Sequence, residues 1–92
     1  MHLEVVSPEA VLFSSEVDSI AVPGKNGEFQ MLENHAPIVS LLQEGEVKVQ
    51  GDITIEEAFQ NKFTQGANGE TVLTISSGTI ELKDNKVIVL AD

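Results

Sequence analysis

The sequence of 92 residues contains no cysteine, arginine, tryptophan or tyrosine. Without cysteine, disulfides and thiolate metal sites are excluded, and a reducing compartment fits the composition. Phenylalanine is the only aromatic residue, which argues against a domain that stacks on bases or sugar rings. No hydrophobic run approaches the roughly 20 residues of a membrane-spanning helix, and no basic segment precedes an apolar one as in a secretion signal. Neither element is therefore expected.

Positive charge is also scarce. The sequence has five lysines against fifteen Asp and Glu residues, which gives a net charge of -10. A field of this sign repels phosphate backbones and anionic headgroups, so nucleic-acid binding and direct lipid insertion are not expected. The length is that of one domain, which we expect to span residues 1–92. With 41% hydrophobic residues, such a domain can build a core without disulfide or metal staples.

Hydrophobic and polar residues alternate along several segments, which is the pattern of strands with one solvated face. The alternation is found over residues 2–6, 46–50 and 79–83. Two other segments, 72–75 and 87–90, are apolar at nearly every position and are predicted to be interior strands.

Turn signals separate these segments. Asn26-Gly27 and Asn68-Gly69 are the strongest, because Asn-Gly supplies the positive φ angles of tight hairpins. Weaker signals are Ser7-Pro8, Pro23-Gly24 and Asp84-Asn85. Many short strands with frequent turns predict an all-β sandwich or flattened barrel.

One segment, residues 56–63, departs from the strand pattern. Ala58, Phe59 and Phe63 have helix-like spacing among good helix formers. A short helical insert therefore competes there with continuation of a strand.

No group of residues indicates an enzyme. His2 and His35 lack a nearby set of further ligands, so no metal site is expected. No serine lies in a Gly-x-Ser-x-Gly elbow, and Gly24 and Gly27 lack the rest of a phosphate-binding loop. We expect neither a catalytic residue nor a cofactor.

A rigid corner is predicted at Asn34-His35-Ala36-Pro37, because Pro37 holds the residue before it in an extended conformation. His35 has two interpretations of equal weight there. It is either a structural histidine satisfied by backbone groups or a contact residue for a partner.

Several short segments occur in a distinctive order: Leu3-Glu4-Val5-Val6-Ser7-Pro8, Gly27-Glu28-Phe29, His35-Ala36-Pro37, Gly45 before Val47, Ser77-Gly78 before Ile80, and Val87-Ile88-Val89-Leu90-Ala91-Asp92. Together they resemble the amino-terminal domain of the epsilon subunit of F-type ATP synthases, called delta in mitochondria. The resemblance does not cover about residues 51–69. This segment is longer than the simple hairpin expected at that place. Asn34 replaces a common Gly but tolerates the same left-handed backbone, so the corner is expected to persist. Thr79 replaces a second Gly.

The resemblance implies a ten-stranded β-sandwich on the central stalk that couples ion flow to ATP synthesis and has no catalytic role. It implies a peripheral position at the cytoplasmic face of the bacterial inner membrane. The implied partners are the γ subunit and the ring of c subunits, whose loops usually carry Arg. The expected c-ring contacts are Gly27, Glu28, Phe29 and Asn34, with Glu28 accepting a hydrogen bond from that Arg and Phe29 packing beside it. The expected γ contacts are Ser7, His35, Ala36, Pro37, Ser40 and Glu46.

Many family members continue after Leu-Ala-Asp into two helices that inhibit ATP hydrolysis, and some bind ATP there through Arg. The sequence in hand stops at Asp92 and has no Arg. It is therefore expected to couple rotation without this inhibition and to bind no nucleotide. Two alternatives remain, a free-standing β-sandwich recognition domain and a small jelly-roll enzyme.

Overall fold

The computed structural model describes all of residues 1–92 and confirms the all-β prediction. Ten strands and one 3-10 helix, η1 (Glu57–Lys62), follow one another along the chain. The strands are β1 (His2–Val6), β2 (Val11–Glu16), β3 (Ser19–Gly24), β4 (Gly27–Leu32), β5 (Ile38–Leu42), β6 (Gly45–Gln50), β7 (Phe63–Gln65), β8 (Thr71–Ile75), β9 (Gly78–Lys83) and β10 (Lys86–Ala91).

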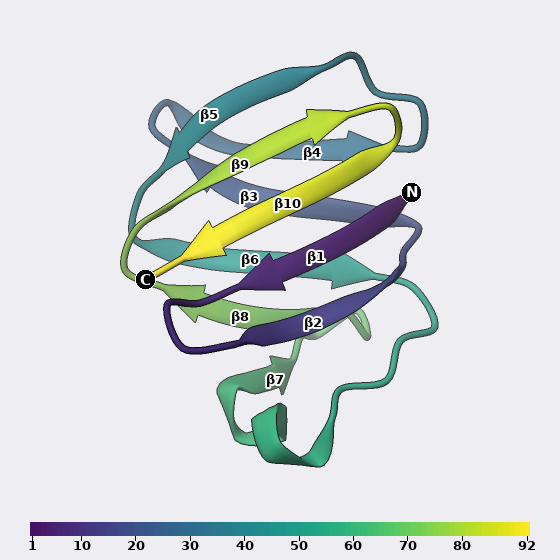
Figure 1. The fold of residues 1–92 in the computed structure, drawn as a ribbon, viewed down its shortest axis with the longest axis vertical. Helices are drawn as coiled ribbons and strands as arrows, with labels where there is room; N and C mark the ends of the chain where they lie inside the picture. Colours follow the sequence, from purple (N-terminus) through teal and green to yellow (C-terminus); the bar gives the residue numbers. More distant parts are fainter.

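The strands form one curled sheet whose two halves face each other (Figure 1). The front layer has the order β2-β1-β10-β9-β5, and the rear layer contains β4, β3, β6, β8 and β7. The layers are continuous where β5 meets β3, through the single pair Gly24 and Leu42. All pairs are antiparallel except β1 with β10. The result is a β-sandwich.

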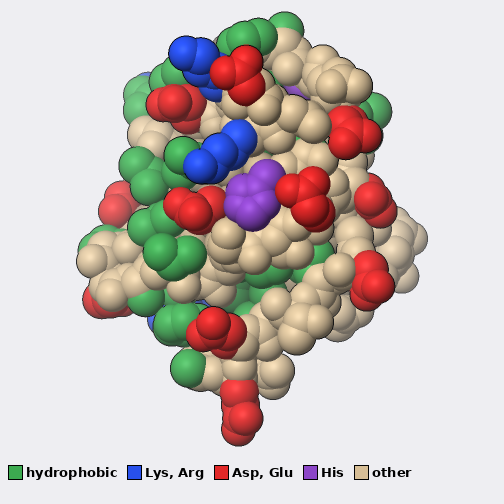
Figure 2. Space-filling view, turned by 45° about the vertical axis from the view of Figure 1, so that its right-hand side comes forward, with side chains coloured by type: hydrophobic (Ala, Val, Ile, Leu, Met, Phe, Trp, Pro, Cys, Tyr) green, Lys and Arg blue, Asp and Glu red, His purple; other side chains and the backbone are tan.

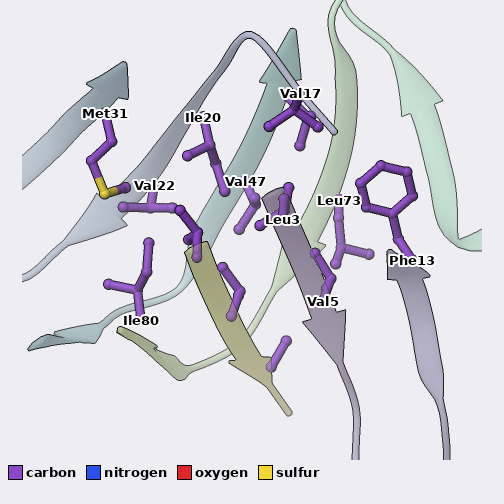
Figure 3. Packing of buried hydrophobic residues seen from close by; sticks show 14 of the residues in the cluster. Leu3, Val5, Phe13, Val17, Ile20, Val22, Met31, Val47, Leu73 and Ile80 are labelled. Atoms are coloured by element: carbon purple, nitrogen blue, oxygen red, sulfur yellow. The ribbon is translucent and has the colours of Figure 1, made fainter. Parts of the chain in front are cut away.

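The alternating hydrophobic residues of both layers meet between them (Figure 3). From the front layer, Leu3 and Ile80 are fully buried, and from the rear layer Ile20, Val22 and Val47 are fully buried. Ser19 is the one buried polar residue, and no buried side-chain polar atom lacks a hydrogen-bond partner. The core is therefore apolar and closely packed, which makes the domain a stiff body.

The turns follow the predicted chemistry with one shift. Asp84 and Asn85 both have positive φ and join β9 to β10, and Asn34 has a φ of 64°, as expected for a residue that stands in for Gly. The β3–β4 hairpin turns on Lys25 and Asn26, so Asn26-Gly27 is not the centre of the turn. Only Gly27, the first residue of β4, takes a positive φ, of 118°.

The segment between β6 and β8 contains both structures that its sequence suggested. Residues 57–62 form η1, and Phe63 then begins β7, which pairs with β8. The hydrophobic side chains of this segment pack partly buried against the main core, namely those of Ile53, Ile55, Phe59 and Phe63. They explain why the extra residues fold onto the sandwich (Figure 1, lower end).

The prediction of an interior strand at residues 87–90 is confirmed by its position in the sheet, but the burial of both its faces is not. β10 lies inside its layer, between β1 and β9, but only one of its faces is covered. Val87 and Val89 point into the core, whereas Ile88 is half-buried and Leu90 is 50% exposed. The uncovered face of β10 is the starting point for the candidate interaction surfaces.

Candidate interaction surfaces

The outward face of the front layer carries a row of four hydrophobic side chains and one threonine, here called the apolar row; three of the hydrophobic side chains are exposed, and Val6 and Thr79 are half-buried. Its members lie opposite one another on adjacent strands, in the order Leu41, Thr79, Leu90, Val6 and Val11. Leu41, Leu90 and Val11 are each about half exposed, at 53%, 50% and 52%. Four strand spacings separate Leu41 from Val11, which is about 19 Å. Contiguous hydrophobic surface of this kind marks a contact site.

The neighbouring row on the same face is mixed. Val39, 76% exposed, lies opposite Glu81, and half-buried Ile88 lies between Glu81 and Glu4. Figure 2 shows hydrophobic side chains gathered on the left of the visible face, with charged groups and a histidine toward its centre and right. A partner for this face therefore needs a hydrophobic centre and gains from cations placed against Glu4 and Glu81.

The rear layer has a different, polar outward face. A shallow hollow of about 270 Å³ is lined there by Ser19, Ala21, Glu28, Phe29, Gln30, Lys48, Gln50 and Glu70. Lys48 Nζ lies 3.1 Å from Glu28 Oε1, and their side chains are 35% and 52% exposed. The hydrogen bond that Lys48 donates to Glu28 is the main cause that raises the pKa of Lys48, and the charges of Glu46 and Glu70 add to it.

The expected c-ring residues lie along β4, at the edge of the rear layer, where β4 pairs only with β3. Gly27 and Glu28 begin the strand, while Asn34 lies in the turn beyond its other end, Leu32, which is about 17 Å from Gly27 at ~3.3 Å per residue. Phe29 is partly buried against the core. Its ring lies against Gly24, where an added Cβ atom would come within 2.6 Å of Phe29 Cε1. The exposed hydrophobic residue of this strand is Leu32.

The corner after β4 is fixed by polar contacts. Asn34 N–H donates to Asn85 Oδ1 at 3.0 Å, which ties the corner to the β9–β10 turn. The Asn85 amide lies 3.5 Å from Glu33 Oε1, and the α-amino group of Met1 donates to the same carboxylate at 3.2 Å. These hydrogen bonds, the one from the α-amino group above all, lower the pKa of Glu33.

The expected γ contacts do not come together as one cluster. Ser7 closes the β1–β2 turn, its hydroxyl donating to Ala10 O at 3.3 Å, next to the apolar row. His35, Ala36 and Pro37 lie before β5, at the end of the strand opposite to Leu41. His35 is exposed, and its Nδ1 lies 2.7 Å from Ala36 O.

The remaining two expected γ contacts are also apart from the row. The side chain of Ser40 shares the inward face of β5 with Ile38 and Leu42, and its hydroxyl donates to Leu41 O at 3.2 Å. Glu46 lies on β6, in the rear layer. The sequence did not lead us to expect Val39, Leu41 and Leu90 as contact residues, although they are exposed. The available signal was that they are hydrophobic on the strand positions that alternate with the core.

Other kinds of site find little support. No three His, Asp or Glu side chains are placed to share a metal ion. His2 joins two residues of β2, with Nδ1 at 3.2 Å from Glu16 Oε2 and Nε2 at 3.1 Å from Ser14 Oγ, but all three are on the open outer face of the sheet. The single helix, η1, is too short to cross a bilayer.

Comparison with known proteins identifies the family. A family model described as the β-sandwich domain of the ATP synthase delta/epsilon chain matches residues 1–92. The ATP synthase epsilon chain of Campylobacter curvus is 36% identical over 92 residues, 100% of this chain and 60% of that protein. The epsilon chain of Desulforamulus reducens is 37% identical over 91 residues, 99% of this chain and 58% of that protein. The chain thus spans about three fifths of the length of these curated relatives.

Solved structures show the same fold. A chain in the central stalk and c-ring structure of the Tetrahymena thermophila mitochondrial ATP synthase superposes with a TM-score of 0.74 at 11% identity, covering 99% of this chain and 62% of that one. A chain of the Euglena gracilis mitochondrial ATP synthase gives a TM-score of 0.72 at 20% identity, covering 97% and 48%. Together with the match over the whole sequence, the observed β-sandwich shows that this chain belongs to the delta/epsilon chain family of ATP synthases.

Proposed function

We propose that this chain is a non-catalytic rotor component of an F-type ATP synthase, in which it binds the γ subunit and the ring of c subunits. Its relatives are epsilon chains of ATP synthases, and one structural neighbour comes from a central stalk and c-ring assembly. The observation that carries the proposal is the apolar row, with Leu41 and Leu90 half exposed on a rigid sheet. Such side chains gain hydrophobic free energy when a partner covers them.

The γ subunit binds the outward face of the front layer in this proposal. The row supplies the centre of the contact, and Glu4 and Glu81 beside it pair with cations of γ. Ser7 is adjacent to the row and takes part in the contact. His35 touches γ only if the interface extends beyond the first residue of β5, Ile38, which lies about 10 Å from Leu41 at ~3.3 Å per residue.

The c ring binds along the edge strand β4. Glu28 at one end and Asn34 beyond the other are exposed, and Leu32 replaces Phe29 as the hydrophobic contact because Phe29 points into the core. The two partners then use different layers of the sandwich and can bind at once. A stiff body held on one face and along one edge transmits torque without any chemistry of its own, at the cytoplasmic membrane surface where its partners hold it.

Co-purification tests the proposal. The chain is expressed with an affinity tag together with the γ subunit of the same organism, and the eluate is examined for γ and for the catalytic head. Recovery of a stoichiometric complex supports the rotor role. A chain that elutes alone, with γ folded in the flow-through, contradicts it and favours the free-standing recognition domain.

A further inference from the structure

The residue proposed to contact the c ring, Glu28, is already paired within the chain. Lys48 Nζ reaches across from β6 and lies 3.1 Å from Glu28 Oε1. Lys48 is the only cation among the residues that line the hollow on the rear layer. A partner cation that takes both carboxylate oxygens of Glu28 must therefore compete with Lys48.

The surroundings of Lys48 make such an exchange possible. Glu70 lines the same hollow, and the charges of Glu46 and Glu70 both favour the protonated lysine. When Glu28 turns to another cation, the ammonium keeps two acidic neighbours. The partly exposed lysine is not left as an unpaired buried charge, whose cost would be prohibitive.

We propose that Lys48 sets the specificity of the Glu28 contact by holding the carboxylate until a partner guanidinium replaces it. An ammonium is a compact, strongly hydrated point charge, whereas a guanidinium matches a carboxylate with two parallel hydrogen bonds. An incoming lysine would gain nothing over Lys48, but an arginine would. The inference rests on the proposed binding to the c ring and adds the residue that controls it.

The test measures binding of the tagged chain to the detergent-solubilised c ring of the same organism, at low and high salt. Lys48→Gln removes the competitor and is expected to tighten binding about twofold to fivefold at low salt, the range typical of an exposed ion pair. Lys48→Arg strengthens the internal pair and is expected to weaken binding by a similar factor. The opposite signs separate competition from misfolding, since a misfolded variant can only lose affinity.

Two controls exclude a general charge effect. Lys62→Gln removes the same charge from exposed η1 and is expected to leave the affinity within twofold. In the Glu28→Gln background, Lys48→Gln is expected to change nothing, because the Glu28 carboxylate, for which Lys48 and the partner compete, is gone. If Lys48→Gln tightens binding equally in that background, or has no effect on the wild type, the exchange is refuted while c-ring binding stands. If the c ring binds neither form, both proposals fall.

Discussion

Leu41 of β5 and Leu90 of β10 lie on either side of Thr79, each directly opposite it across a strand pair. The two leucines come from positions 49 residues apart in the sequence (90 minus 41), and β9 between them brings them into one row. Their proximity is consequently a property of the fold and not of any local motif. This relationship leads to the first prediction.

Replacing both leucines by alanine should weaken γ binding about 10-fold to 30-fold, because covering half of each side chain contributes about 1 kcal/mol. The melting temperature should change little, since both side chains are half exposed. Titration calorimetry with γ and thermal melts of the free chain measure the two quantities. Thr54→Ala and Ala58→Ser, at exposed positions of the extra segment, are matched controls that should bind normally.

The core of the sandwich gives the contrasting result. Ile80 is fully buried on β9, and Ile80→Ala should lower the free energy of unfolding by about 2–5 kcal/mol through lost contacts and the cavity left behind. Val39→Ala, on the exposed face, should change it by less than about 0.5 kcal/mol. Urea denaturation followed by circular dichroism compares them. Equal effects would show that the two faces of the front layer are misassigned.

Gly78 is required for the close approach of two strands. A Cβ at this position would collide with the backbone carbonyl of Leu90, and a backbone atom cannot move aside as a side chain can. Gly78→Ala should therefore destabilise the domain by about 1–3 kcal/mol, as overpacking does, and should also disturb the apolar row through Leu90. Thr79→Ala, on the same strand, is the control for stability alone and should lower the free energy of unfolding by less than about 0.5 kcal/mol. A Gly78→Ala variant of unchanged stability and γ affinity would contradict the packing.

Stability should depend on pH through Glu33. The α-amino group of Met1 and the Asn85 amide lower the pKa of Glu33 from its usual 4.5. The ionised carboxylate therefore stabilises the folded state above pH 4.5, and this stabilisation is lost as the pH falls through the folded-state pKa. The hydrogen bond to Glu33 is the main cause that raises the pKa of the α-amino group above 8.0. The protonated amino group therefore stabilises the folded state below pH 8.0, and this stabilisation is lost at higher pH.

Glu33→Gln should therefore melt at a lower temperature than the wild type between about pH 5 and 8, with the difference shrinking on both sides. The comparison needs a chain whose α-amino group at Met1 is free. Glu44→Gln, at an exposed position away from Met1, serves as a control for loss of one negative charge. A difference that stays constant from pH 3 to pH 10 would rule out the ion pair as its source.

Period-two alternation was enough to place Leu3, Val5, Ile80 and Leu82 in the core. The left-handed backbone of Asn34 was expected because the resemblance places Asn34 where Gly is common and asparagine tolerates that conformation. The same alternation puts neighbouring residues on opposite faces, which explains why Phe29 cannot accompany Glu28 toward a partner.

Other features depend on tertiary contacts that no local pattern contains. A strand that is apolar on both faces has the same sequence whether its second face is covered by its own chain or by a partner. The alternation therefore marks Leu90 as a hydrophobic residue on the second face of its strand, but it does not say what covers that face. The fold of residues 51–70 depends on how Phe59 and Phe63 meet the core. The pairing of Glu28 with Lys48 depends on the register of β4, β3 and β6.

Thiol labelling tests most directly whether γ covers the apolar row. The chain contains no cysteine, so Leu90→Cys introduces a single thiol at the centre of the row, and Ala58→Cys introduces one on η1, away from it. Reaction with a maleimide is followed in the free chain and in the complex with γ. We predict that γ slows labelling of residue 90 at least about 10-fold and leaves residue 58 unchanged, as expected for burial at the centre of an interface. Equal labelling of residue 90 in the free chain and in a complex that is shown to have formed would contradict the account.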